Sequence, residues 1–228
     1  MPTLPHVTTS ADRVVNRSDR RAARLVAAAL RAGRPSANDA FDRFMPDELR
    51  QVSDRYWTPL PVVRRAAQWL RETQARSVVD LGSGSGKFCV AAALLTRCEF
   101  VGVEQRAPLV AAARDLAAVF GVDDRVSFVT AELDPLTAPP SEAYYLFNPF
   151  GQYTFESDAY DDPALDFTPE VHRRGVSAVT KLLEGAPAGT FVITYNGFGS
   201  KPPPGYEQID IALHLPGTLR LWKHSGPS

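Results

Sequence analysis

The chain has 228 residues, 44% of them hydrophobic, and a formal net charge of −1, so it is long enough to bury one full core. This balanced charge excludes a strong overall field toward nucleic acid or a membrane surface, and no apolar run approaches the roughly eighteen residues that span a bilayer. Cys89 and Cys98 belong to no CxxC pair or Cys/His cluster, so we expect two buried free thiols and no metal site. The N-terminus lacks the apolar stretch of a signal peptide, which indicates a cytoplasmic protein.

Residues 1–55 are expected to form a tail and a helical cap. Over residues 13–34, apolar residues recur at helical spacing between arginines, which predicts a helix with one buried stripe that ends before Pro35. A second helix is expected over residues 37–50. Acidic residues dilute the arginines and no aromatic residues interleave with them, so a cap over a cleft is favoured over contact with nucleic-acid phosphates.

Residues 56–228 show a different pattern, in which short β-rich runs alternate with helical ones after a first helix over 61–75. The expected strands are 77–81, 99–104, 125–130, 143–147 and 190–195, and the expected helices are 86–96, 107–120 and 169–183. This alternation predicts an α/β, Rossmann-like domain with a mostly parallel seven-stranded sheet and helices on both faces. The runs 206–213 and 218–222 alternate apolar and polar residues, which predicts a C-terminal antiparallel hairpin.

A glycine-rich turn after the first expected strand carries the strongest functional signal. The run Asp80-Leu-Gly-Ser-Gly-Ser-Gly86 lies where ligands bind in open α/β sheets, and glycines let the backbone approach a ligand closely. Lys87 stands where a dinucleotide fingerprint needs its third glycine, and Phe88 stands where a P-loop needs Ser or Thr. The Asp80 carboxylate suits a cationic ligand such as S-adenosylmethionine and would repel a pyrophosphate.

Two further positions follow the next expected strands. Glu104 ends the second strand about twenty residues past the glycine turn, where a carboxylate can accept both ribose hydroxyls. Ala131 and Glu132 follow the third strand, where a side chain and a backbone N–H commonly meet an adenine edge. An ordinary turn is the alternative there.

These motifs resemble class I S-adenosylmethionine-dependent methyltransferases, with D-L-G-S-G-S-G, G-V-E and N-P-F at the ends of the first, second and fourth expected strands. They are also similar to the disruptor-of-silencing histone-lysine methyltransferases and to the lysine methyltransferases of ATP synthase c-subunits, whose Tyr/Thr-Pro element Tyr56-Trp-Thr58-Pro matches. The resemblance covers residues 56–228 and implies S-adenosyl-L-methionine as the cofactor. The cofactor-binding candidates are Tyr56, Thr58, Asp80, Gly82, Ser83, Gly84, Gly86, Glu104, Gln105, Ala131, Glu132 and Asn148.

The fourth expected strand ends in Asn148-Pro-Phe150, which resembles the N-P-P-[FY] element of amino- and amide-nitrogen methyltransferases. In that element the Asn side chain accepts a hydrogen bond from the target nitrogen, and an aromatic ring covers the methyl group. Asn148, Phe150 and Tyr153 are therefore the catalytic candidates; an ordinary Asn-Pro turn is the alternative. The loop over 152–168 mixes aromatic and acidic side chains, which suits a cationic acceptor, although a solvated loop is equally consistent with it.

The sequence thus predicts an S-adenosylmethionine-dependent methyltransferase that acts on a nitrogen of a small molecule, a peptide or a protein side chain. Nucleic acid and membranes are not expected as partners. An NAD-binding oxidoreductase and a non-catalytic S-adenosylmethionine-binding partner protein stay open as alternatives.

Overall fold

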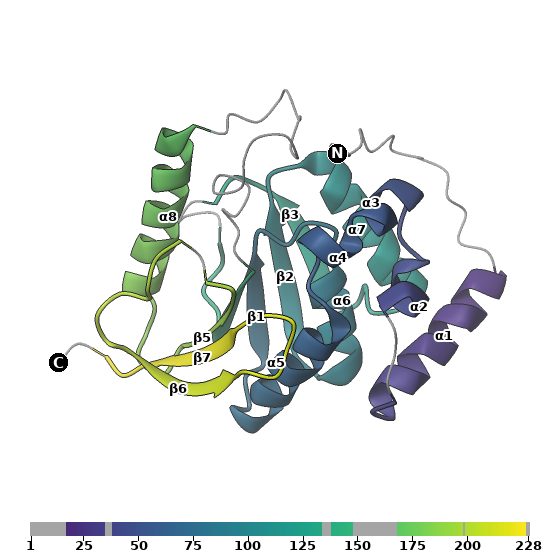
Figure 1. Cartoon of the computed structure of the whole chain (residues 1–228), viewed down its shortest axis with the longest axis horizontal. Coiled ribbons are helices and arrows are strands. Elements are labelled where there is room, and N and C mark those ends of the chain that lie inside the picture. The colour runs from purple at the N-terminus through teal and green to yellow at the C-terminus, as the bar shows by residue number, and fades with distance from the viewer. Residues whose placement is uncertain (1–16, 35–37, 134–137, 148–167, 198, 227–228) are drawn as a thin grey trace.

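A computed structural model describes residues 17–34, 38–133, 138–147, 168–197 and 199–226 of the protein. Its centre is a seven-stranded sheet in the order β3-β2-β1-β4-β5-β7-β6 (Figure 1). The strands are β1 (Ser77–Leu81), β2 (Glu99–Glu104), β3 (Val126–Thr130), β4 (Ala143–Phe147), β5 (Phe191–Tyr195), β6 (Tyr206–Ala212) and β7 (Leu219–His224). Strands β1 to β5 pair in parallel, and β7 is antiparallel to both β5 and β6. The predicted parallel sheet with a C-terminal antiparallel hairpin is confirmed.

Helices cover both faces of this sheet, as the sequence predicts. The long helices are α1 (Arg17–Arg31), α5 (Leu60–Glu72), α6 (Lys87–Leu95), α7 (Ala107–Phe120) and α8 (Pro169–Glu184). Successive residues of a strand point to opposite faces, so Val78 joins the core under α1, α5, α6 and α7, whereas Val79 joins the core under α8. Figure 1 shows α8 on one side of the sheet and the other helices on the opposite side.

The helix predicted over 37–50 is wrong in extent, because the structure has short helices there: α2 (Asn38–Asp42), α3 (Asp47–Gln51) and, just beyond, α4 (Ser53–Tyr56). Pro46 precedes α3 with φ −50° and ψ 146°, and a proline has no N–H with which to continue a helix. These helices share the main core with the sheet domain, and the Phe41 ring of α2 stacks on Phe120 of α7 with centroids 4.5 Å apart.

Both cysteines are free and buried, as predicted. Among the helices that the structure describes, none is long and apolar enough to cross a membrane.

Candidate functional site

The glycine-rich loop connects β1 to α6 at the carboxyl edge of the sheet. Gly82, Gly84 and Gly86 all have positive φ, at 84°, 53° and 74°, which L side chains rarely adopt. The Gly82 N–H and the Ser83 N–H both donate to Val103 O, at 2.9 and 3.0 Å. The loop is therefore held against the end of β2, beside the position of Glu104.

Two of these glycines also make room for neighbouring side chains. A Cβ on Gly84 would lie 2.4 Å from the Trp57 ring, and a Cβ on Gly86 would lie 2.6 Å from the Phe128 ring. The Trp57 indole Nε1 in turn donates to Leu49 O at 2.9 Å, which attaches it to α3. The sequence predicts a cofactor role for these glycines, and the packing adds a second reason for glycine at both positions.

The carboxylate of Asp80, a residue just before this loop, is buried, and only 3% of the residue is exposed. The Cys89 thiol donates to its Oδ2 at 3.4 Å, and no ion pair to Asp80 occurs among the described residues. Burial, with a smaller contribution from the nearby Glu104, raises the pKa of Asp80 to about 7, although the Cys89 hydrogen bond opposes this shift. A buried acid of this kind would gain stability from a cation placed beside it.

We expect Asp80→Asn to weaken S-adenosylmethionine binding ten- to a hundredfold at pH 7.5, because one charge-assisted hydrogen bond contributes about 1.5–3 kcal/mol. In the wild type, affinity should rise roughly tenfold from pH 6 to pH 7.5, because the cation binds the ionised carboxylate and a pKa of about 7 leaves most of it protonated at pH 6. Calorimetry at the two pH values measures both effects.

The Asp80→Asn protein should lose this pH dependence and remain folded. A folded-state pKa above the ordinary 3.8 means that Asp80 contributes stability at low pH that is lost as the pH rises through about 7. The amide variant should therefore melt no lower than the wild type at pH 8. Equal affinities in a folded variant would remove Asp80 from the cofactor site.

Glu104 is buried, and its carboxylate already accepts several hydrogen bonds. Its Oε2 accepts from the Gly84 N–H at 3.0 Å, and its Oε1 accepts from the Arg106 N–H at 3.0 Å and from Arg106 Nε at 2.9 Å. A carboxylate has about four acceptor positions, so both ribose hydroxyls can bind together only if the Arg106 side chain moves. Glu104 thus also holds the glycine loop in place.

We expect Glu104→Ala to bind S-adenosylhomocysteine more weakly than Glu104→Gln, because an amide oxygen still accepts one hydrogen bond. Titration of S-adenosylhomocysteine and its 2′-deoxy analogue separates the ribose contact from the support of the loop. If the wild type binds both compounds equally well, Glu104 supports the loop but does not bind the ribose.

The other predicted cofactor residues differ in whether their polar groups already make hydrogen bonds within the protein. The Ala131 N–H donates to Glu104 O at 3.1 Å, so this donor is engaged, while Gln105 is exposed. The hydroxyls of Ser83 and Ser85 are buried and have no hydrogen-bond partner among the described residues. Unpartnered polar groups at a buried loop fit the binding of a polar ligand there, and together with the Asp80 carboxylate they are compatible with S-adenosylmethionine.

The Tyr56-Trp-Thr58-Pro element lies between the N-terminal helices and the sheet. The Thr58 hydroxyl shares a hydrogen bond of 2.9 Å with the Tyr145 hydroxyl of β4, and the Tyr145 ring stacks on Phe88 with centroids 3.5 Å apart. Tyr56 is only partly buried, and its ring lies beside that of Trp57 with centroids 6.2 Å apart. Thr58 thus links this element to the centre of the sheet.

Sequence reasoning missed a buried ion pair directly after the glycine loop. Lys87 Nζ lies 2.8 Å from Asp42 Oδ1 and 3.0 Å from Ser53 Oγ, and Ser53 Oγ donates to Asp42 Oδ2 at 2.6 Å. Lys87 and Asp42 are each only 2% exposed. Burial lowers the pKa of Lys87, and Asp42 opposes this shift. A lysine in the first turn of a helix is unfavourable next to the helix dipole, and this was the available signal that Lys87 has an acidic partner.

The catalytic candidates Asn148, Phe150 and Tyr153 lie outside the described residues. The described part of β4 ends at Phe147, whose ring lies beside that of Tyr195 of β5 with centroids 4.6 Å apart. Among the described residues, no group of three or more His, Cys, Asp or Glu side chains is placed to hold a metal ion.

Comparison of the sequence with protein-family models and with curated proteins gives no match. Solved structures do match the fold. An RNA methyltransferase from Salinibacter ruber in complex with S-adenosylhomocysteine is 22% identical, with a TM-score of 0.51 over 75% of this chain and 95% of that one. A putative O-methyltransferase from Klebsiella pneumoniae is 14% identical, with a TM-score of 0.56 over 92% and 100% of the two chains. Cofactor-bound Rv0187 from MTB is 15% identical, with a TM-score of 0.54 over 98% of each chain. The protein therefore has the Rossmann-like methyltransferase fold.

Proposed function

We propose that the protein is an S-adenosylmethionine-dependent methyltransferase of the cytoplasm, with residues 1–55 as a tail and cap and residues 56–228 as the methyltransferase domain. The buried Asp80 carboxylate beside a glycine loop carries this proposal, because it offers a buried acid to a cationic ligand. The shared fold supports it, since the Salinibacter structure contains S-adenosylhomocysteine.

The proposed acceptor is a nitrogen of a small molecule, a peptide or a protein side chain. The fold does not select among acceptors, because one structural neighbour is an RNA methyltransferase and another a putative O-methyltransferase. The proposal therefore rests on Asn148-Pro-Phe150 and on the resemblance to the disruptor-of-silencing and c-subunit lysine methyltransferases. A cationic acceptor such as an amine suits the acidic composition of residues 152–168.

Each candidate residue has a separate part in this scheme. The chemistry that the cofactor supplies when bound is a methyl group on a sulfonium, open to in-line displacement. Asp80 would bind the α-ammonium, and Glu104 would accept from the ribose. Asn148 would hold the acceptor nitrogen in line, with Phe150 and Tyr153 around it. Positioning of this kind can account for much of a rate enhancement, up to an effective molarity of about 10⁵–10⁸ M.

Thermal unfolding with S-adenosylhomocysteine and with NADH tests the cofactor. A ligand present at a hundred times its Kd stabilises a protein by about 2.7 kcal/mol, so we expect S-adenosylhomocysteine, but not NADH, to raise the melting temperature by several degrees. A shift in melting temperature with NADH alone would favour the oxidoreductase instead. The sequence disfavours this alternative, because Lys87 stands where a dinucleotide-binding turn has its third glycine.

Transfer of a tritiated methyl group into a fractionated lysate, followed by identification of the labelled species, tests the reaction and its acceptor. A labelled amine, amide or lysine product is the expected result. Cofactor binding without any labelled product would favour the non-catalytic alternative, and a labelled oxygen would contradict the nitrogen acceptor.

A further inference from the structure

A cavity of about 890 Å³ lies at the amino-terminal edge of the sheet, where β1 begins. The helices α1, α5 and α6 all end beside it. Among the residues that the structure describes, its lining includes six arginines and no aspartate or glutamate: Arg31, Arg64, Arg65, Arg71, Arg76 and Arg97. The whole chain has 25 basic and 26 acidic residues, so the described part of the lining, with six cationic and no anionic side chains, departs from the average composition.

Backbone carbonyl groups hold three of these guanidinium groups in place. Arg31 Nε donates to Leu94 O at 3.1 Å, and Arg71 Nη1 donates to Leu95 O at 3.0 Å, both at the end of α6. Arg64 donates to two carbonyls just past the end of α1, at 2.7 and 2.9 Å. These bonds orient the side chains and offset only part of their charge, and a guanidinium with five N–H donors keeps others for a ligand.

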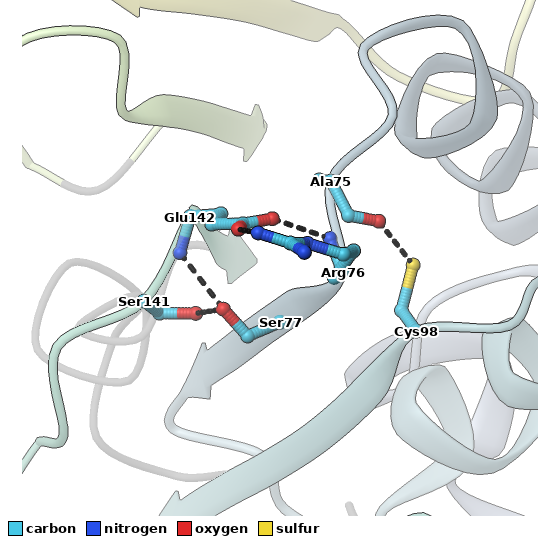
Figure 2. A network of polar contacts seen from close by, with 6 residues as sticks. All are labelled: Ala75, Arg76, Ser77, Cys98, Ser141 and Glu142. Atoms are coloured by element: carbon cyan, nitrogen blue, oxygen red, sulfur yellow. Dashed lines mark hydrogen bonds and ion pairs between the residues drawn. The ribbon is translucent and has the colours of Figure 1, made fainter.

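Only two of the six arginines are paired with carboxylates among the described residues. Arg65 lies 2.8 Å from Asp210, and Arg76 lies 2.9 Å from Glu142, a pair that Figure 2 shows at the start of β1. The ends of α1, α5 and α6 add about −0.5 charge each. Six positive charges against two carboxylates and three helix ends leave an excess of about +2.5. A singly charged chloride would balance less than half of this excess.

We propose that this cavity binds a phosphate-bearing anion, either a free polyphosphate or nucleotide or the phosphates of a polynucleotide. Guanidinium groups bind phosphate oxygens in a bidentate manner, and the volume is that of an ordinary ligand pocket. The cavity opens at the start of β1, whereas the glycine loop follows its end, roughly 13 Å away for a strand rise of about 3.3 Å per residue. The site is therefore separate from the proposed cofactor site and does not depend on it.

Calorimetric titration of the full chain with inorganic pyrophosphate at low ionic strength tests this site. Arg97 is exposed and makes no ion pair among the described residues, so Arg97→Glu reverses one cavity charge without breaking a visible contact. We expect pyrophosphate to bind with a stoichiometry of one and Arg97→Glu to weaken it at least tenfold. The matched control is Arg24→Glu on the exposed side of α1, outside the cavity lining, which should change the affinity less than twofold.

Absence of pyrophosphate binding, or an equal loss in Arg97→Glu and Arg24→Glu, would overturn the proposal. Modification of arginines by phenylglyoxal, followed by peptide mass spectrometry, gives a readout without a variant: pyrophosphate should protect Arg97 and Arg71 but not Arg24, and equal protection of all three would contradict a site.

Titration with ATP and with a short oligouridylate distinguishes the two sources of phosphate. Tighter binding of ATP supports a free nucleotide, and tighter binding of the oligonucleotide supports a polynucleotide. In both cases pyrophosphate should compete, and failure to compete would place the phosphates elsewhere. S-adenosylhomocysteine affinity should be the same in all variants, so this test and that of the methyltransferase function fail independently.

Discussion

Lys87→Met is expected to destabilise the protein by about 3–5 kcal/mol, because it leaves the Asp42 carboxylate buried without its counter charge. Lys87 and Asp42 are each 2% exposed, so water cannot replace the missing ammonium, and Ser53 is the remaining polar partner seen in the structure. Urea unfolding at pH 7.5 measures the change in the free energy of unfolding.

The matched comparison is an exposed ion pair. Arg50 and Asp47 lie 3.1 Å apart with side chains 43% and 73% exposed, so Arg50→Ala should cost less than about 1 kcal/mol. Lys87→Met combined with Asp42→Leu should recover most of the lost stability, because no buried charge is then unpaired. A loss below 1 kcal/mol in Lys87→Met alone would show that the pair is not buried in solution.

The sheet could be predicted closely because its signals are local. The strands β1, β2 and β4 begin and end at the predicted residues, and β3 and β5 each begin one residue later than predicted. Each is a short apolar run bounded by turn residues, and strands buried on both faces read as continuous hydrophobic segments. The prediction of one continuous helix over 37–50 was wrong because it rested on the helical spacing of apolar residues. That spacing does not by itself show that Pro46 interrupts the helix.

The candidate site could be predicted only in part, because its contacts join distant parts of the chain. The glycine turn and its two acids are readable from spacing, but Lys87 meets Asp42 from 45 residues away and the Gly84 N–H meets Glu104 from 20 residues away. Cys89 reads as an ordinary core residue, yet its thiol donates to the acid that the proposal assigns to the cofactor. Such pairings follow from the packing of the N-terminal helices and α6 on the sheet, which a single sequence does not display.

Asn148→Ala is expected to reduce kcat by about 30- to 1000-fold while it changes cofactor affinity little. In the sequence, Asn148 directly follows Phe147, the last residue of β4. Strand β4 lies between β1, which carries Asp80, and β5, which ends at Tyr195. A side chain that orients the acceptor nitrogen acts mainly in the transition state, so its loss lowers kcat more than ground-state binding. Deletion of comparable orienting groups costs about 2–4 kcal/mol.

The measurement requires the identified acceptor, or an amine that the enzyme accepts, together with a titration of S-adenosylhomocysteine into each variant. Phe150→Ala is the companion variant, and its smaller effect should fall mainly on the KM of the acceptor, because it removes packing and not a directed hydrogen bond. Asp80→Asn should show the opposite division, with weaker cofactor binding and a smaller change in kcat at saturation. If Asn148→Ala retains the wild-type turnover, Asn148-Pro-Phe150 is an ordinary turn, and the groups that orient the acceptor must then be sought among the aromatic and acidic side chains of residues 152–168.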